Sequence, residues 1–178
     1  LRRRLPTMLD GDQRRIRLAY SLAFSLPGTP VLFYGEEIGM AENLAIEGRY
    51  SVRSPMQWSS DPQAGFTTSG EPCRPLVEDG PFSYHEVNAA SQRRDPHSLH
   101  NWMERLIRRR RECPEFGWGT WALLDTGDDA VFAHRCDWED STVVAVHNLA
   151  GREASAHLVL GVEGELVDLF EDEDHALD

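Results

Sequence analysis

The feature that most restricts the fold is the short apolar run TPVLFYG at residues 29–35, bounded by Pro30 and Gly35. It follows a helical pattern after only a Pro-Gly pair. The run has no regular alternation with polar residues, so it suits a parallel strand that is buried on both faces. A helix, a short connection and a buried strand form the repeating unit of α/β folds. We therefore expect an α/β fold for this part of the chain.

The helical pattern before this run covers residues 12–26. Asp10 and Gln13 fit a start that resembles a capping box, and Pro27 and Gly28 end the pattern. The apolar residues recur at helical spacing, which predicts one buried face. The members of that expected face are Ile16, Ala19, Leu22, Ala23 and Leu26.

A second helix is predicted over residues 97–112, after a long segment. Asp95 is its expected N-cap and Pro96 its first helical residue. The segment between, residues 36–95, has little periodicity, and loops of that length are usually functional or disordered. We interpret the four arginines at 108–111 as a solvated face of the helix. Its apolar face consists of Leu99, Trp102, Met103, Leu106 and Ile107.

After Gly117 the hydrophobic period changes from helical spacing to two. Five short runs separated by turn-forming residues predict antiparallel strands joined by tight turns. We therefore divide the chain into an α/β part, residues 1–115, and an antiparallel β-domain, residues 116–178. The five expected strands are GTWALLD, AVFAHRC, STVVAVHNL, SAHLVL and ELVDLF.

Composition excludes several classes of function. The formal net charge is −12, which argues against a nucleic-acid partner, because phosphate binding needs a basic surface. All 18 basic residues are arginine, so no lysine chemistry is available. The cysteines Cys73, Cys113 and Cys136 fit neither a disulfide framework nor paired metal-ligand spacing. We therefore expect the protein to be located in the reducing cytoplasm. No apolar run has the ~20 residues of a membrane span, and we expect no metal, cofactor or membrane partner.

Three stretches in order carry a resemblance to a known family. The last-strand motif of the α-amylase superfamily, glycoside hydrolase family thirteen, is similar to LPGTPVLFYGEEIGM. The following loop of its α-glucosidase and trehalose synthase branch resembles VRSPMQWSSDPQAGFT, and the final barrel helix of the trehalose synthase group resembles NAASQRRDPHSLHNWMERLIRRRREC. The resemblance implies the last quarter of a (β/α)8 TIM barrel followed by an incomplete antiparallel β-sandwich. In that reading TPVLFYG is the eighth strand, between the seventh and eighth helices.

The catalytic carboxylates of the family have no counterpart in this sequence. Its nucleophile, acid/base and third acidic residue lie in motifs resembling RxDA, a glutamate at a strand end, and NHDE, none of which occurs here. Glu36 and Glu37 cannot replace them, since adjacent strand residues point to opposite faces. We therefore assign no catalytic residue and expect a fragment open at both ends that is inactive by itself.

The resemblance does imply binding residues. Arg53 is expected beside the sugar ring whose bond is broken, paired with a carboxylate from an earlier loop; alternatively, it only pins its own loop to the barrel rim. Glu37 is either a supporting residue at the barrel mouth or a solvated carboxylate. Trp58 and Phe66 either stack on sugar or anchor the loop. Tyr34 completes the supporting set.

The implied function is that of the C-terminal part of an enzyme acting on α-glucosidic bonds by a retaining mechanism. It is expected to resemble a trehalose synthase, which isomerises maltose and trehalose, or an α-glucosidase. The expected partner is an α-glucoside or disaccharide. The alternative is a non-catalytic remnant or a binding module that retains the amylase scaffold.

Overall fold

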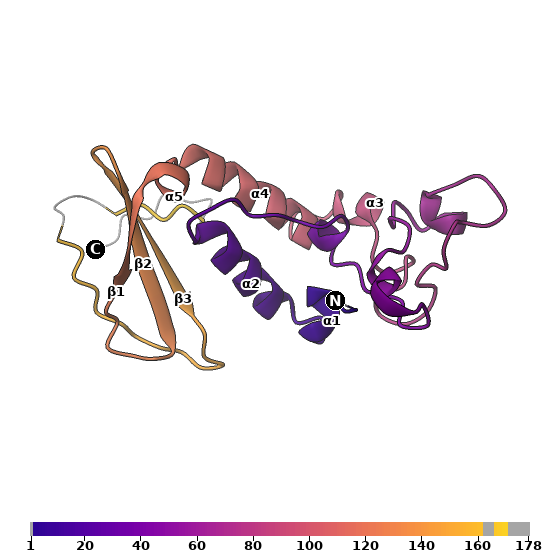
Figure 1. Cartoon of the computed structure of the whole chain (residues 1–178), viewed down its shortest axis with the longest axis horizontal. Coiled ribbons are helices and arrows are strands. Elements are labelled where there is room, and N and C mark those ends of the chain that lie inside the picture. The colour runs from indigo at the N-terminus through magenta and orange to yellow at the C-terminus, as the bar shows by residue number, and fades with distance from the viewer. Residues whose placement is uncertain (1, 162–165, 171–178) are drawn as a thin grey trace. The chain divides into compact units, whose positions relative to one another are not determined.

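A computed structural model describes residues 2–161 and 166–170 of the chain. One compact unit combines Leu1–Tyr20 with Val31–Arg105, and the other combines Ser21–Pro30 with Leu106–Asp178. The helices and 3-10 turns are α1 (Leu5–Met8), α2 (Gln13–Ser25), η1 (Glu36–Ile38), η2 (Gly48–Val52), η3 (Pro62–Gly65), α3 (Ala89–Gln92), α4 (Leu99–Glu112) and α5 (Glu115–Trp118) (Figure 1). The strands are β1 (Thr120–Leu124), β2 (Val131–Trp138) and β3 (Ser141–Asn148).

Helix α2 confirms the first predicted helix, but its cap differs from the prediction. Asp12 Oδ1 accepts hydrogen bonds from the backbone N–H groups of Arg14 at 2.9 Å and Arg15 at 3.3 Å. Asp10 lies in the left-handed region with φ of 53°, in the turn before the helix. The N-cap is therefore Asp12, because only a residue directly before the first turn reaches its free N–H groups.

The buried face of α2 was predicted only in part. Ile16 is fully buried, whereas Ala23 is exposed and Leu22 is half-buried. The helix instead buries Tyr20 and Phe24, each 5% exposed. Aromatic rings remove more apolar surface from water than alanine side chains, so they occupy the inward positions.

Helix α4 confirms the second predicted helix and begins two residues later than expected. Asp95 Oδ1 accepts from the backbone N–H of His97 at 2.9 Å, but Ser98 Oγ accepts from Asn101 N–H at 3.2 Å and caps the helix itself. Its buried residues are Leu99, Met103 and Leu106.

The apolar run at 29–35 does not form the predicted strand. No described segment pairs with it, and Val31 is 87% exposed. A strand ladder requires a neighbouring backbone, so apolar composition alone cannot create one. The run ends at Gly35, whose φ of 83° lies in the left-handed region. A Cβ there would overlap Met40 Sδ, so glycine is required at this turn.

The β part forms one antiparallel sheet in the order β1-β2-β3, with β2 in the middle (Figure 1). Thr120 pairs with Asp137, and Val131 pairs with Asn148. This confirms the first three predicted strands. SAHLVL forms no strand; the carbonyl of Leu160 accepts from the Arg135 side chain instead of a backbone ladder. ELVDLF begins at residue 165, outside the described residues, and residues 166–170 form no strand.

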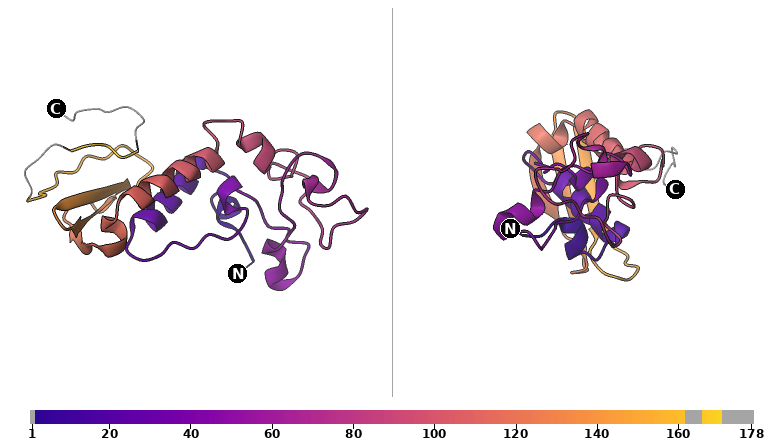
Figure 2. Two further views of the ribbon diagram at one scale, coloured as in Figure 1. Left: turned by 90° about the horizontal axis from the view of Figure 1, so that it is seen from above. Right: turned by 90° about the vertical axis from the view of Figure 1, so that its right-hand side faces the viewer.

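Residues 36–95 consist of coil interrupted by short helical turns, as the left-hand view in Figure 2 shows. The segment has a small core of its own, in which Ile38, Met40, Met56 and Ala89 are buried and Val87 packs against them. This core explains how a long loop with little sequence periodicity keeps a defined path. No helix in residues 2–161 or 166–170 is long and apolar enough to cross a membrane.

Candidate functional site

The candidate site lies in the first unit, where the apolar run turns into the long loop. Glu36 and Glu37 are half-buried in the 3-10 turn η1, and Glu36 Oε2 accepts from Phe33 N–H at 3.2 Å. The prediction placed both residues at the end of a strand, and this is wrong, because they lie in a 3-10 turn. Successive residues of a 3-10 turn are rotated by about 120°, so the two carboxylates still diverge.

Tyr34 connects the end of the apolar run to the loop that carries Arg53. Its hydroxyl donates to the carbonyl of Ser54 at 2.8 Å, and its ring lies 4.5 Å from that of Phe33. The ring is 42% exposed. The structure thus brings the predicted residues Tyr34 and Arg53 into one region through the backbone of Ser54.

Arg53 is exposed directly after η2. Its backbone N–H donates to Tyr50 O at 3.0 Å, and its guanidinium carbon lies 5.8 Å from the centroid of the Tyr50 ring. Arg49 and Arg74 lie over the same ring, at 6.0 Å and 4.3 Å. Within the described chain no carboxylate pairs with the Arg53 guanidinium. The region therefore carries three cations around one half-exposed aromatic ring.

The residues on both sides of Arg53 are fixed in place. Ser51, Ser54 and Gln57 are fully buried. The Gln57 side-chain amide donates to the carbonyls of Val87 and Phe82, and the Gln57 carbonyl accepts from Ala89 N–H at 2.9 Å. An exposed guanidinium on a tightly held backbone has little positional freedom at its base.

Trp58 and Phe66 flank a tight turn in the same loop. Gln63 and Ala64 have left-handed φ values of 59° and 56°, and Ala64 O accepts from the backbone N–H groups of Trp58 and Ser59. The two rings are 53% and 43% exposed. Left-handed non-glycine residues cost about 1–3 kcal/mol each, and such strain is common at functional sites.

Both aromatic side chains reach the protein surface. A hollow of about 830 Å³ lies beside Phe66, lined by residues of the 61–70 segment. Half-exposed aromatic rings present flat apolar faces while their edges remain in water. Both side chains therefore leave part of their rings open to solvent, and Phe66 lines the hollow.

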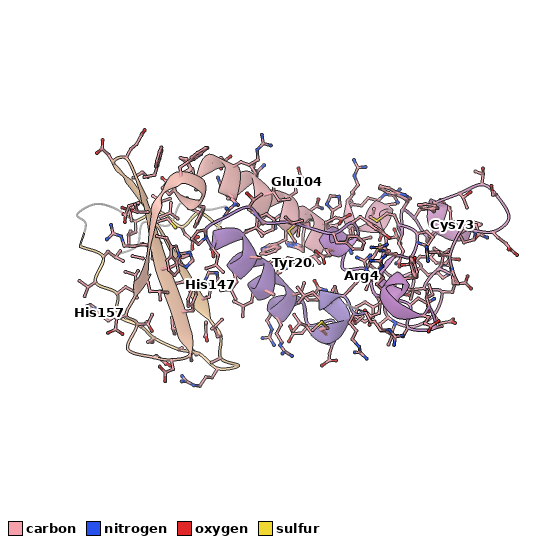
Figure 3. All side chains as sticks on the ribbon, viewed as in Figure 1. Arg4, Tyr20, Cys73, Glu104, His147 and His157 are labelled. Carbon is pink, nitrogen blue, oxygen red and sulfur yellow. The ribbon has the colours of Figure 1, made fainter. Side chains whose placement is uncertain are left out.

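Arg4 is a residue of this region that the sequence did not reveal. It is 3% exposed, and Figure 3 shows it within the first unit. Its Nη1 donates to Tyr34 O at 2.8 Å and its Nη2 to Val52 O at 2.7 Å. Burial lowers the pKa of the guanidinium, against the attraction of Tyr34, Glu36 and Glu37. Its neighbours Arg2 and Arg3 are exposed, so the triplet alone gives no signal that one arginine is buried.

A second buried polar cluster, also missed, lies in the other unit. His134 and His147 are 0% and 4% exposed, and their rings are stacked with centroids 6.3 Å apart. His134 Nε2 donates to Ser25 O at 3.0 Å, and His147 Nε2 lies 3.1 Å from Ser21 Oγ. In the region that the structure describes, no group of three or more His, Cys, Asp or Glu side chains could hold a metal ion.

Residues 2–119 match the family described as Alpha amylase, catalytic domain. The chain is 39% identical over 156 residues to trehalose synthase from Pimelobacter sp. (strain R48), covering 84% of this chain and 27% of that protein. It is 40% identical over 153 residues to trehalose synthase from Thermus thermophilus, covering 84% and 16%. The chain thus spans roughly a quarter or less of these relatives.

Other relatives extend the comparison. Amino acid transporter heavy chain SLC3A1 from Mus musculus is 32% identical over 162 residues, which cover 86% of this chain and 22% of that protein. Among solved structures, trehalose-6-phosphate hydrolase from Bacillus licheniformis matches with a TM-score of 0.70 and 22% identity, covering 93% of this chain and 37% of that chain. The matches show a fold related to the TIM barrel, together with a three-stranded antiparallel sheet.

Proposed function

This chain belongs to the α-amylase family, and from that premise we propose that it is part of an enzyme acting on α-glucosidic bonds by a retaining mechanism. In this proposal residues 1–115 belong to the C-terminal part of the (β/α)8 barrel and residues 116–178 to an antiparallel β-domain. The activity is the isomerisation of maltose and trehalose, with α-glucosidase as the nearest variant. The identity to two trehalose synthases supports this choice.

Arg53 is the sugar-binding residue of this proposal. The observation that carries it is an exposed guanidinium between fully buried residues, Ser51 and Ser54, with no carboxylate partner among the described residues. In the described part the Arg53 guanidinium makes no ion pair and lies 5.8 Å from the centroid of the Tyr50 ring. The planar fork can hold a carboxylate and still donate to a sugar hydroxyl.

The supporting residues surround this position. Tyr34 fixes the Arg53 loop through its bond to Ser54, and Glu37 adds negative charge at the same turn. Trp58 and Phe66 present their rings for stacking on the saccharide. The retaining reaction needs two carboxyl groups about 5–5.5 Å apart, which in this proposal come from other strands of the barrel.

The substrate is an α-glucoside or disaccharide, and the proposed compartment is the cytoplasm. The three cysteines support that compartment, because Cys73, Cys113 and Cys136 are free thiols. The acidic balance of the chain gives no support to a nucleic-acid partner.

One relative favours a second candidate, a non-catalytic interaction module. The chain is 32% identical to an amino acid transporter heavy chain, so this scaffold also occurs in a protein that is not named as a sugar enzyme. In this alternative, the residues around Arg53 serve only the fold or a protein contact.

A chimera distinguishes the two. The segment of Thermus thermophilus trehalose synthase that matches this chain is replaced by the corresponding residues of this chain, and conversion of maltose to trehalose is measured. Activity that depends on Arg53 supports the enzyme proposal. A folded chimera without activity, beside an active parent enzyme, favours the interaction module.

A further inference from the structure

We propose that Arg4 is a positioning residue that sets where Arg53 presents its guanidinium; this inference rests on the sugar-binding role proposed above. Arg4 holds two backbone points with one planar group. Nη1 donates to Tyr34 O at 2.8 Å, and Nη2 donates to Val52 O at 2.7 Å. Val52 directly precedes Arg53, so this bond holds the peptide group that joins Val52 to Arg53, next to the Cα atom that carries the Arg53 side chain.

A second set of bonds ties the same N-terminal segment to the loop. The Glu42 carboxylate accepts from Arg4 N–H at 3.0 Å and from the Thr7 hydroxyl at 2.5 Å. Ser51 Oγ donates to Arg2 O at 2.8 Å. The segment therefore holds the loop at Glu42, at Ser51 and at Val52, on the N-terminal side of Arg53. This leaves little freedom for the loop to shift as a body.

The surroundings of the Arg4 side chain fit a residue that positions its neighbours better than a residue that stabilises the fold in general. Within the part of the chain that the structure describes, no carboxylate pairs with its guanidinium, and its Nε is buried without a hydrogen-bond partner. Burying a charge in this way costs free energy. A rigid fork, however, fixes the direction between two carbonyls, which a flexible ammonium cannot do. The Phe33 and Tyr34 rings, 4.9 Å and 5.2 Å from its guanidinium carbon, further restrict its orientation.

Hydrogen exchange tests this placement without any assay of activity. Two amides report on the loop: Arg53 N–H, bonded to Tyr50 O at 3.0 Å, and Asn43 N–H, bonded to Ser51 O at 2.9 Å. In the 178-residue chain with Arg4→Lys, we expect both to exchange about tenfold faster or more, while amides of α2 keep their rates. The control is Arg14→Lys, whose side chain is 96% exposed and which should change neither.

Two outcomes would overturn the inference. In one, the loop amides keep their exchange rates in Arg4→Lys. In the other, all protected amides of the first unit accelerate equally, which means that Arg4 serves general stability. Because this measurement needs no substrate, it remains decisive even if the proposed activity fails its own test.

A double-mutant cycle in the chimera tests the link to Arg53. If Arg4 acts only through Arg53, the single change Arg4→Lys lowers kcat/KM. In a chain that already carries Arg53→Lys, the same change then causes little further loss. Independent, multiplicative losses from the two changes would contradict a positioning role. Loss of activity in the unmutated chimera would count against the proposed function, and the exchange measurement would then decide on Arg4.

Discussion

Acidification should weaken the second unit through His147. This side chain is 4% exposed and stacks on His134, and Figure 3 shows it on β3. Burial, followed by the proximity of His134, lowers the pKa of His147 from 6.5 to about 4, although its bond to Ser21 acts in the opposite direction. The Nδ1 atom of His147 is buried without a partner among the described residues, so a proton added there has no acceptor.

The direction and size of this loss of folding stability follow from the linkage between proton binding and folding. The unfolded chain binds a proton near pH 6.5 and the folded chain only near pH 4, so the stabilisation is complete above pH 6.5 and is lost as pH falls toward 4. The total difference corresponds to about 3 kcal/mol, of which about 2 kcal/mol is lost between pH 7 and pH 5.

Urea unfolding followed by the circular dichroism of the sheet, at pH 7 and pH 5, measures this loss. His147→Gln removes the titrating group and should reduce the pH dependence by most of that amount, whatever its stability at pH 7. His157→Gln is the matched control, because His157 is exposed. If the original chain and His147→Gln lose the same stability between the two pH values, His147 is not the group whose protonation destabilises the fold.

Asp12→Ala should lower the free energy of unfolding by about 0.5–2 kcal/mol, whereas Asp10→Ala should leave the α2 cap intact, as thermal melts of both variants would show. Gly35→Ala should cost about 1–2 kcal/mol for the left-handed backbone alone and more through its contact with Met40; an unchanged melting temperature would contradict this. The purified 178-residue chain should show no turnover of maltose, trehalose or sucrose, because none of the family's motifs for the catalytic carboxylates occurs in its sequence, and measurable turnover would overturn that expectation.

Local patterns in the sequence were sufficient for the elements whose hydrogen bonds close within a short stretch. Helices α2 and α4 and the hairpins β1-β2 and β2-β3 were predicted in this way. Cap positions were less certain, because Asp10 and Asp12 both suit a cap, and the turn at Gly11, with φ of 74°, decides between them. The run at 29–35 failed as a strand for the opposite reason, since pairing depends on other segments.

The residues that the sequence missed are those defined by distant contacts. Arg4 bonds to residues 30 and 48 positions away. His134 and His147 bond to residues 109 and 126 positions away. Contacts between residues so far apart in the chain produce no periodic pattern in the sequence. Arg53 was predicted through family resemblance, and its role at the sugar remains a prediction.

The most direct test of that role is Arg53→Lys in the trehalose synthase chimera, with kcat/KM for maltose and the thermal midpoint measured on the same preparation. The charge is kept but the fork is lost, so about 2–4 kcal/mol of transition-state stabilisation should disappear, a loss of tens- to a thousandfold in rate. We expect that loss in kcat/KM with little change in the midpoint. A nearly normal kcat/KM would remove Arg53 from the sugar site and contradict the proposal.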